Sequence, residues 1–224
     1  MEKKLYKEEE KNKIYCIGDS HVNLFRKMYS KKYNKKLHRY FKVFHIGPVL
    51  AYNLCEKKSS TGGREKLFKK LEKIPNGSWV MLVFGEIDCR IHLSKRIIEQ
   101  GKDIHKVIKE CVNRYFSVIE EIRTIGYNII VFNVVATTIH ECTYFPKYGS
   151  CKERNNITKI FNKYVKMECK DKNFVFISIF EKLVDKNGIT IWKYYKDNIH
   201  LGYRALPAIV SQINKKVKNF NIKV

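Results

Sequence analysis

The sequence predicts an α/β fold, in which a five-stranded parallel sheet carries helices on both faces. Short runs rich in β-branched and aromatic residues alternate along the chain with stretches of three- and four-residue apolar periodicity. One of these runs, Trp79 to Phe84, is apolar at every position, as expected for a central strand covered on both faces. Strands that alternate with helices join into a parallel sheet, and ligands bind such sheets at the carboxyl ends of the strands.

Composition indicates one domain of ordinary size. The chain has 224 residues, and a domain of this length buries roughly 70% of its unfolded surface. No Pro-, Gly- or Ser-rich linker and no internal repeat divides it. We therefore expect a charged leader at residues 1–12 and a single domain at residues 13–224, whose oligomeric state the sequence leaves open.

The pattern of cysteines and apolar residues predicts a cytoplasmic protein, or one of the host cytoplasm or virion if it is viral. The leader does not resemble a signal peptide, and no apolar run has the length of a membrane span. The seven scattered cysteines are predicted to be free thiols, with a Cys142–Cys151 disulfide as the alternative in an oxidising environment. His140 shares a loop with these two cysteines, but the spacing matches no common zinc site. We expect no metal and no cofactor.

The chain is strongly basic, with 45 Lys and Arg residues against 22 Asp and Glu and a formal net charge of +23. Only nine of the basic residues are Arg, whereas bidentate phosphate recognition favours Arg. Lys, Asn, Ile, Tyr and Phe are all frequent, which is typical of an A/T-rich genome. Coding bias therefore explains the basic surface better than nucleic-acid binding, which remains open, and an anionic glycan is a further possible partner.

The first half of the predicted domain contains two strands and two helices. Residues 13–17 form the first strand, and a helix from Val22 to about Ser30 follows it. The alternating segment Tyr40 to Ile46 is the second strand, which Gly47-Pro48 ends. Val49 to Lys57 is predicted to be a short helix.

The centre of the chain supplies the third strand between two amphipathic helices. Arg64 to Lys73 places Leu67 and Leu71 on one face. The apolar central strand follows a Pro-Asn-Gly turn. The clearest helical periodicity runs from Asp103 to Ile125, and a glycine ends it.

The last part of the chain supplies two strands, a long loop and two helices. Asn128 to Val135 is the fourth strand, and the irregular segment Ala136 to Arg154 after it has the length of a substrate lid. A helix is predicted from about Ile157 to Cys169 and a fifth strand from Phe174 to Ile179. The final helix runs from about Tyr203 to Val217.

Ser20 is the candidate nucleophile, because it follows the first strand directly in the sequence Gly18-Asp19-Ser20-His21. A serine at such a strand-to-helix turn is exposed at the sheet edge, and its amide lies at a helix N-terminus that favours negative charge. A hydroxyl that attacks a carbonyl needs this position, because an oxyanion forms beside it. Serine also occurs at helix N-caps for structural reasons alone.

His200 is the candidate base and Asp197 the residue that orients it. The two lie three positions apart in a loop before the last helix, so that the carboxylate can turn back to the imidazole Nδ1 and leave Nε2 for Ser20. A lone Asp-x-x-His is weak evidence, but its combination with Gly-Asp-Ser after the first strand is specific.

With these two motifs the sequence resembles the SGNH (GDSL-like) hydrolase superfamily from residue 14 to about residue 205. The resemblance implies a flavodoxin-like α/β/α sandwich and ester chemistry by Ser20, His200 and Asp197. The family's second block is a glycine after the second strand, which is Gly47 here, and the amides of Ser20 and Gly47 would then donate to the oxyanion. Its third block falls on Gly85 to Asp88.

The chain departs from the family in that third block, where Gly-x-Asn-Asp is replaced by Gly85-Glu86-Ile87-Asp88. Loss of the Asn side chain as an oxyanion donor costs ~2.7–4 kcal/mol of transition-state stabilisation. Arg90, held by Glu86 or Asp88, is the candidate replacement. A structural Glu86–Arg90 ion pair is the equally open alternative. The variant segment, which continues as Cys89-Arg90, resembles a subgroup associated with surface-polysaccharide biosynthesis.

Further residues near the predicted site are expected to bind substrate. They are Asp19, Gly85, Glu86, Asp88 and His21, although a surface position at the start of a helix explains His21 as well.

The sequence predicts a serine-dependent acyl-ester hydrolase or acyltransferase that acts on O-acetylated carbohydrate or a small ester. It does not choose between water (esterase) and a sugar hydroxyl (acetyltransferase) as the acceptor. The alternative is a non-catalytic SGNH-like module that binds a glycan or another polyanion, its oxyanion hole damaged at Ile87.

Overall fold

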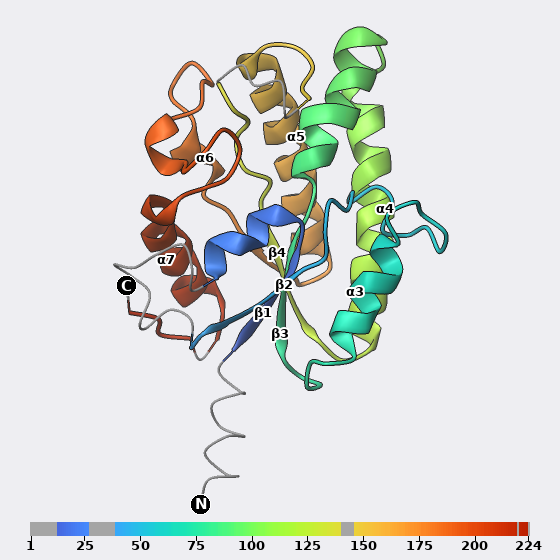
Figure 1. Cartoon of the computed structure of the whole chain (residues 1–224), viewed down its shortest axis with the longest axis vertical. Coiled ribbons are helices and arrows are strands. Elements are labelled where there is room, and N and C mark those ends of the chain that lie inside the picture. The colour runs from blue at the N-terminus through green and yellow to red at the C-terminus, as the bar shows by residue number, and fades with distance from the viewer. Residues whose placement is uncertain (1–12, 27–38, 140–145, 219, 224) are drawn as a thin grey trace, which may run out of the picture.

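The structure is a computed structural model that describes residues 13–26, 39–139, 146–218 and 220–223. All strand pairs of its five-stranded sheet are parallel, and the strand order is β2-β1-β3-β4-β5 (Figure 1). This confirms the predicted fold class. The strands are β1 (Ile14–Gly18), β2 (Phe41–His45), β3 (Trp79–Val83), β4 (Asn128–Phe132) and β5 (Val175–Ile177).

Helices cover both faces of the sheet and make two separate apolar cores. Alternate side chains of a strand point to opposite faces, so Tyr15 and Ile17 pack into one core while Ile14 and Cys16 pack into the other. The first core is closed by α3 (Gly63–Leu71), α4 (Ile104–Thr124) and α5 (Cys151–Asp171). The second is closed by α6 (Phe180–Leu183) and α7 (Leu206–Lys216).

Helix α5 begins six residues earlier than predicted, at Cys151 instead of Ile157. The cause is a capping box, in which the hydroxyl of Ser150 accepts a hydrogen bond from the Glu153 amide while the Glu153 carboxylate accepts one from the Ser150 amide. The predicted lid of residues 136–154 is shorter for that reason, and its residues 140–145 lie outside the described part.

Two predicted helices of the first half are wrong. The predicted α-helix from Val22 is a short 3₁₀ helix, η1 (Ser20–Phe25), which ends at Arg26; residues 27–38 lie outside the described part, as does the leader. The predicted helix over 49–57 is a series of turns. Its amides at Ala51 and Tyr52 donate to the Asp88 carboxylate, 2.8 and 3.1 Å away, instead of to helix carbonyls.

A helical segment that the sequence did not predict follows β3. It includes two π-helical stretches, η3 (Asp88–Leu93) and η4 (Lys95–Glu99). Ser94 lies between them, and its hydroxyl donates to the carbonyl of Cys89, five residues earlier, at 2.6 Å. Such wide turns often occur at functional sites, and the first of these begins five residues after the carboxyl end of the central strand β3.

Gly18 ends β1 where the chain turns toward Ser20, and a Cβ atom there would overlap the backbone carbonyl of Val83 on the neighbouring strand. Gly18→Ala is therefore expected to lower the free energy of unfolding by about 3 kcal/mol, because backbone cannot yield as a side chain can. Urea unfolding measures the change. The matched control is Gly202→Ala, because Gly202 has an ordinary φ of −94° and a Cβ there would come no closer than 3.3 Å to another atom; equal losses in the two variants would contradict the packing argument.

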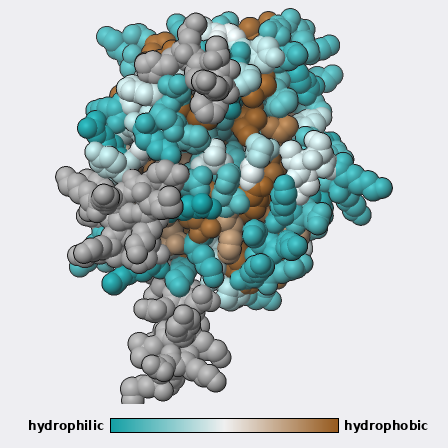
Figure 2. Space-filling view, viewed as in Figure 1, coloured by the Kyte–Doolittle hydropathy of each residue, from teal (hydrophilic) through white to brown (hydrophobic). Residues whose placement is uncertain are grey.

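The coloured part of the face shown in Figure 2 is mostly hydrophilic, and a narrow band of hydrophobic side chains crosses it. Within the described segments, no helix combines the length and apolarity that a membrane crossing needs.

Candidate active site

Ser20 lies at the carboxyl end of β1 as the first residue of η1. Asp19 caps this turn, because its Oδ1 accepts a hydrogen bond from the His21 amide at 2.9 Å. The Asp19 amide donates to the Val83 carbonyl at 3.2 Å, which fixes the turn to β3. The sheet therefore determines where the half-buried Ser20 side chain is presented.

The structure brings Ser20, His200 and Asp197 into one hydrogen-bonded chain. His200 Nε2 lies 2.7 Å from the Ser20 hydroxyl, and His200 Nδ1 lies 2.9 Å from both carboxylate oxygens of Asp197. Asp197 also accepts from the amides of His200 and Ile199 at 2.7 and 3.0 Å. Partial burial raises the pKa of Asp197, but these hydrogen bonds outweigh burial and hold the pKa well below its ordinary value. The carboxylate is thus ionised when it faces the imidazole.

The loop that carries His200 and Asp197 is closed at both ends. Tyr195 pairs with Leu201 across its base, and the amide of Lys196 donates to the carbonyl of His200 at 3.0 Å. The buried Tyr195 hydroxyl donates to the Ala136 carbonyl at 2.5 Å, which ties this base to the segment after β4. The sequence analysis did not find this anchoring role of Tyr195.

Two backbone amides beside Ser20 are available to an anionic oxygen. Gly47 follows β2, which pairs with β1, and the amide of Ile46 donates to the Gly18 carbonyl at 3.0 Å. Gly47 has φ +95°, in the region that favours glycine, and a Cβ there would meet nothing within 4 Å. Over the described part of the chain, neither the Ser20 nor the Gly47 amide donates to a protein acceptor.

Arg90, the predicted third donor, is held in a buried ion pair. Its Nε donates to Glu86 Oε1 at 2.6 Å and its NH2 group to Glu86 Oε2 at 3.2 Å. Its NH1 group donates to the carbonyl of Pro146 at 2.6 Å. These contacts favour the structural ion pair over the oxyanion donor, and they join the segment after β3 to the chain before α5.

Asp88 was predicted to bind substrate, and Glu86 or Asp88 was predicted to hold Arg90; the structure shows Glu86 in the second role. The Asp88 side chain is completely buried and accepts hydrogen bonds from the amides of Ala51 and Tyr52. Burial raises the pKa of Asp88, although these two hydrogen bonds lower it. Asp88 thus anchors the turns that follow Gly47 and acts on the candidate oxyanion site only through that loop.

His21 is buried, so the expectation of a surface histidine is wrong. Its ring lies 5.0 Å from the His200 ring, and its Nε2 lies 3.6 Å from Glu86 Oε2. Burial lowers the pKa of His21, but Asp19 and Glu86 outweigh burial and raise it. Burial raises the pKa of Asp19 to about 6, partly offset by His21. Asp19, His21 and Glu86 therefore form a buried cluster of acidic and basic groups beneath the Ser20 turn.

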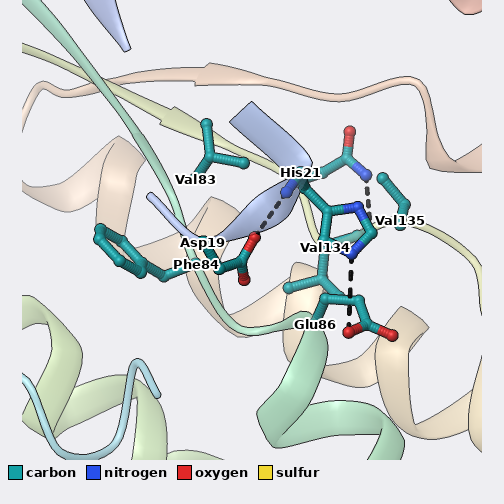
Figure 3. A pocket seen from close by; sticks show the side chains of 8 residues that line it. Asp19, His21, Val83, Phe84, Glu86, Val134 and Val135 are labelled. Atoms are coloured by element: carbon teal, nitrogen blue, oxygen red, sulfur yellow. Dashed lines mark hydrogen bonds and ion pairs between the residues drawn. The ribbon is translucent and has the colours of Figure 1, made fainter. Parts of the chain in front are cut away.

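Figure 3 shows Asp19, His21 and Glu86 around a cavity of about 10 Å³, with Val83, Phe84, Val134 and Val135 completing its wall. That volume is at the lower limit for one water molecule. Asp19, His21 and Glu86 are buried, so their predicted contact with substrate stays a prediction. Gly85 is also buried; its φ is +106°, and a Cβ there would press against Val134 and Phe161. These residues support the site from within the protein.

Loss of the Glu86 carboxylate should leave a buried guanidinium without its counter-ion. We expect Glu86→Gln to lower the free energy of unfolding by about 3–5 kcal/mol at pH 7. Burial would raise the pKa of Glu86, but His21 and Arg90 hold it at about 2, below the ordinary 4.5. The pair therefore stabilises the fold fully above pH 4.5, and this stabilisation is lost as the pH falls toward 2.

Urea unfolding over that pH range checks this prediction. The control is Glu121→Gln, because Glu121 pairs with Arg64 at 2.6 Å on the surface and should contribute only about 0–1 kcal/mol. Equal effects of the two variants, or a difference between wild type and Glu86→Gln that does not shrink below pH 4.5, would contradict it.

No group of three or more His, Cys, Asp or Glu side chains within the described ranges is arranged to hold a metal ion. Cys151 is a free thiol whose Sγ lies 3.6 Å from the Thr190 hydroxyl. His140 and Cys142, the other members of the loop considered for zinc, lie outside those ranges.

No protein-family model and no curated protein matches the chain. Among solved structures, a GDSL-like lipase from Bacteroides thetaiotaomicron matches with TM-score 0.57 and 11% identity over 95% of this chain and 96% of the other. A catalytic mutant of the acetylxylan esterase Axe2 from Geobacillus stearothermophilus matches with TM-score 0.57 and 12% identity over 95% and 96%. At this identity the likeness shows a shared fold.

Proposed function

We propose that the protein is a serine ester hydrolase or acyltransferase in which Ser20 is the nucleophile. The observation that carries the proposal is the hydrogen-bonded chain from Ser20 through His200 to Asp197. The Axe2 structures support it, because catalytic mutants of that esterase replace a serine, an aspartate and a histidine, the last two three positions apart. Asp197 and His200 have the same spacing.

In the proposed mechanism, His200 Nε2 takes the proton as the Ser20 oxygen attacks the acyl carbonyl. Asp197 holds the tautomer that protonates Nδ1 and stabilises the imidazolium that forms. The amides of Ser20 and Gly47 donate to the oxyanion. The imidazolium then gives its proton to the departing alcohol, and an acyl-enzyme remains. Water or a sugar hydroxyl, deprotonated by His200, attacks this ester and restores Ser20.

The proposed acyl group is acetyl and the proposed alcohol is a sugar. The support is the likeness to an acetylxylan esterase. The subgroup associated with surface-polysaccharide biosynthesis, which the segment from Gly85 to Arg90 resembles, favours the same class.

Release of acetate from acetylated xylo-oligosaccharides tests this substrate class, with 4-nitrophenyl acetate as the small-ester comparison. We expect the wild type to release acetate from both and Ser20→Ala from neither. Added sugar acceptors separate the two reactions: a transferase yields acetylated acceptor at the expense of free acetate. Hydrolysis of 4-nitrophenyl acetate without any reaction on the sugar esters would contradict the carbohydrate assignment.

A non-catalytic binding module is the second candidate, favoured by one observation. Ile87 occupies the place of an oxyanion donor in the third block, and the contacts of Arg90 with Glu86 do not replace it. Two backbone donors would then carry the whole oxyanion charge. This candidate predicts binding of glycan that is equal in wild type and Ser20→Ala, with no acetate release by either.

A further inference from the structure

A second, larger depression lies on the far edge of the sheet from Ser20. It has a volume of about 710 Å³, and its lining residues belong to α5, β5, α6 and α7 and to the segment between β5 and α6. Strand β5 is the edge strand, three strand positions from β1, which corresponds to roughly 14 Å across the sheet. We call it the lysine groove, after five of its lining residues, which are Lys159, Lys163, Lys166, Lys182 and Lys216.

Within the described residues, positive charge exceeds negative charge in the lining of the lysine groove. Glu181 is its one acidic lining residue. None of the five lysines forms an ion pair with a carboxylate of the described chain. Partial burial lowers the pKa of Lys216, and the nearby charge of Lys166 lowers it further. Cations held this close without counter-ions favour the binding of an anion.

The other lining groups suit a chain of sugars. Asn156 and Gln212 add side-chain amides to the lining, and such amides can bind hydroxyl groups. Ile160 and the partly exposed Phe176 supply apolar surface for a ring.

Two alternative occupants fit less well. The first alternative is a peptide that adds a strand to the edge of β5. Lys216 Nζ donates to the Phe176 carbonyl of β5 at 2.9 Å, and an added strand would need that carbonyl as an acceptor. Phe180 is buried, so the groove offers no row of exposed aromatic rings on which successive bases would stack. The lining also contains no Arg, the residue that favours phosphate.

We propose that the lysine groove binds an acidic polysaccharide through its carboxylate groups, apart from the site at Ser20. The choice of a glycan among polyanions rests on the proposed function. The groove would hold the polymer while an ester on the same molecule reaches Ser20.

Fluorescence anisotropy of a labelled oligogalacturonate of about ten residues tests the proposal, with the full chain carrying Ser20→Ala so that no turnover intervenes. The groove variant combines Lys159→Gln, Lys163→Gln and Lys166→Gln, all exposed on α5. The matched control removes the same charge elsewhere, by Lys102→Gln, Lys106→Gln and Lys109→Gln at and before the start of α4, where all three are exposed.

The groove variant should weaken binding by about tenfold or more and the control by less than about twofold. Equal losses in the two variants, or stronger binding of a neutral galactan or of single-stranded oligothymidylate of equal length, would overturn the proposal. Because binding is measured without catalysis, this result does not depend on whether the chain hydrolyses esters. Hydrolysis of 4-nitrophenyl acetate by wild-type Ser20 should be equal with and without the groove substitutions.

Discussion

Ser20→Ala is expected to lower kcat/KM for 4-nitrophenyl acetate by a factor of about 10⁴–10⁶. The hydroxyl 2.7 Å from His200 Nε2 is the proposed nucleophile, and its removal leaves water as the only attacking group. In serine hydrolases, loss of the nucleophile costs nearly as much as loss of the whole hydrogen-bonded set. His200→Ala should therefore have a similar effect, and the double variant should lose little more than either alone.

Ser178→Ala is the control, because Ser178 also follows a strand and its hydroxyl accepts from a nearby amide, that of Phe180 at 3.3 Å. It should retain wild-type kcat/KM. Retention of more than about a tenth of wild-type activity by Ser20→Ala would contradict the assignment of the nucleophile.

Asp197→Asn is expected to lower kcat/KM by a factor of about 10⁴. The amide oxygen of Asn can still accept from the backbone of Ile199 and His200, so the loop should keep its shape. Its NH₂ group, however, would face His200 Nδ1 and favour the tautomer with the proton on Nε2. That nitrogen could then no longer accept the Ser20 proton.

A turn elsewhere in the chain provides the matched control. Asp185 Oδ1 accepts from the amides of Asn187 and Ile189, both at 2.9 Å. Asp185→Asn makes the same change in a similar hydrogen-bonded loop and should leave kcat/KM unchanged. If the two Asn variants retained equal activity, Asp197 would have no role beyond the shape of its loop.

The order of elements along the chain was enough to predict one parallel sheet, whereas the meeting of Ser20 with His200 was predicted from the Gly-Asp-Ser and Asp-x-x-His motifs and the family resemblance that they carry. The run before Gly18 and the apolar run at Trp79 were predicted as strands of that sheet, and in the structure β1 and β3 are paired neighbours. Carboxyl ends of parallel strands share one edge. The same rule predicted that Gly47, which follows β2, lies at the same edge of the sheet as Ser20.

The directions of individual side chains could not be predicted in the same way. Glu86 and Asp88 lie two positions apart after Gly85, and nothing in their spacing says that one pairs with Arg90 while the other binds amides near residue 51. The π-helical turns after β3 set these directions, and the hydrogen bond from the Ser94 hydroxyl to the Cys89 carbonyl within them has no periodic signal in the sequence. The expected surface position of His21 was wrong for the same reason, because the spacing of residues along the chain does not give the direction of a side chain.

The lysine groove was beyond sequence analysis because its residues come from α5, β5, α6 and α7. In a chain with 45 basic residues a lysine has no distinguishing signal by itself. Only the packing of these elements brings five of them together with one acidic neighbour.

Covalent labelling with a fluorophosphonate tests the central claim most directly, because the reagent reacts with an activated serine and not with an ordinary hydroxyl. Mass spectrometry should find one label per wild-type chain, on the peptide that contains Ser20. Ser20→Ala and His200→Ala should both remain unlabelled, with the wild-type circular dichroism spectrum as the control for folding. A well-folded wild type that takes up no label, or takes it up equally after His200→Ala, would contradict the account.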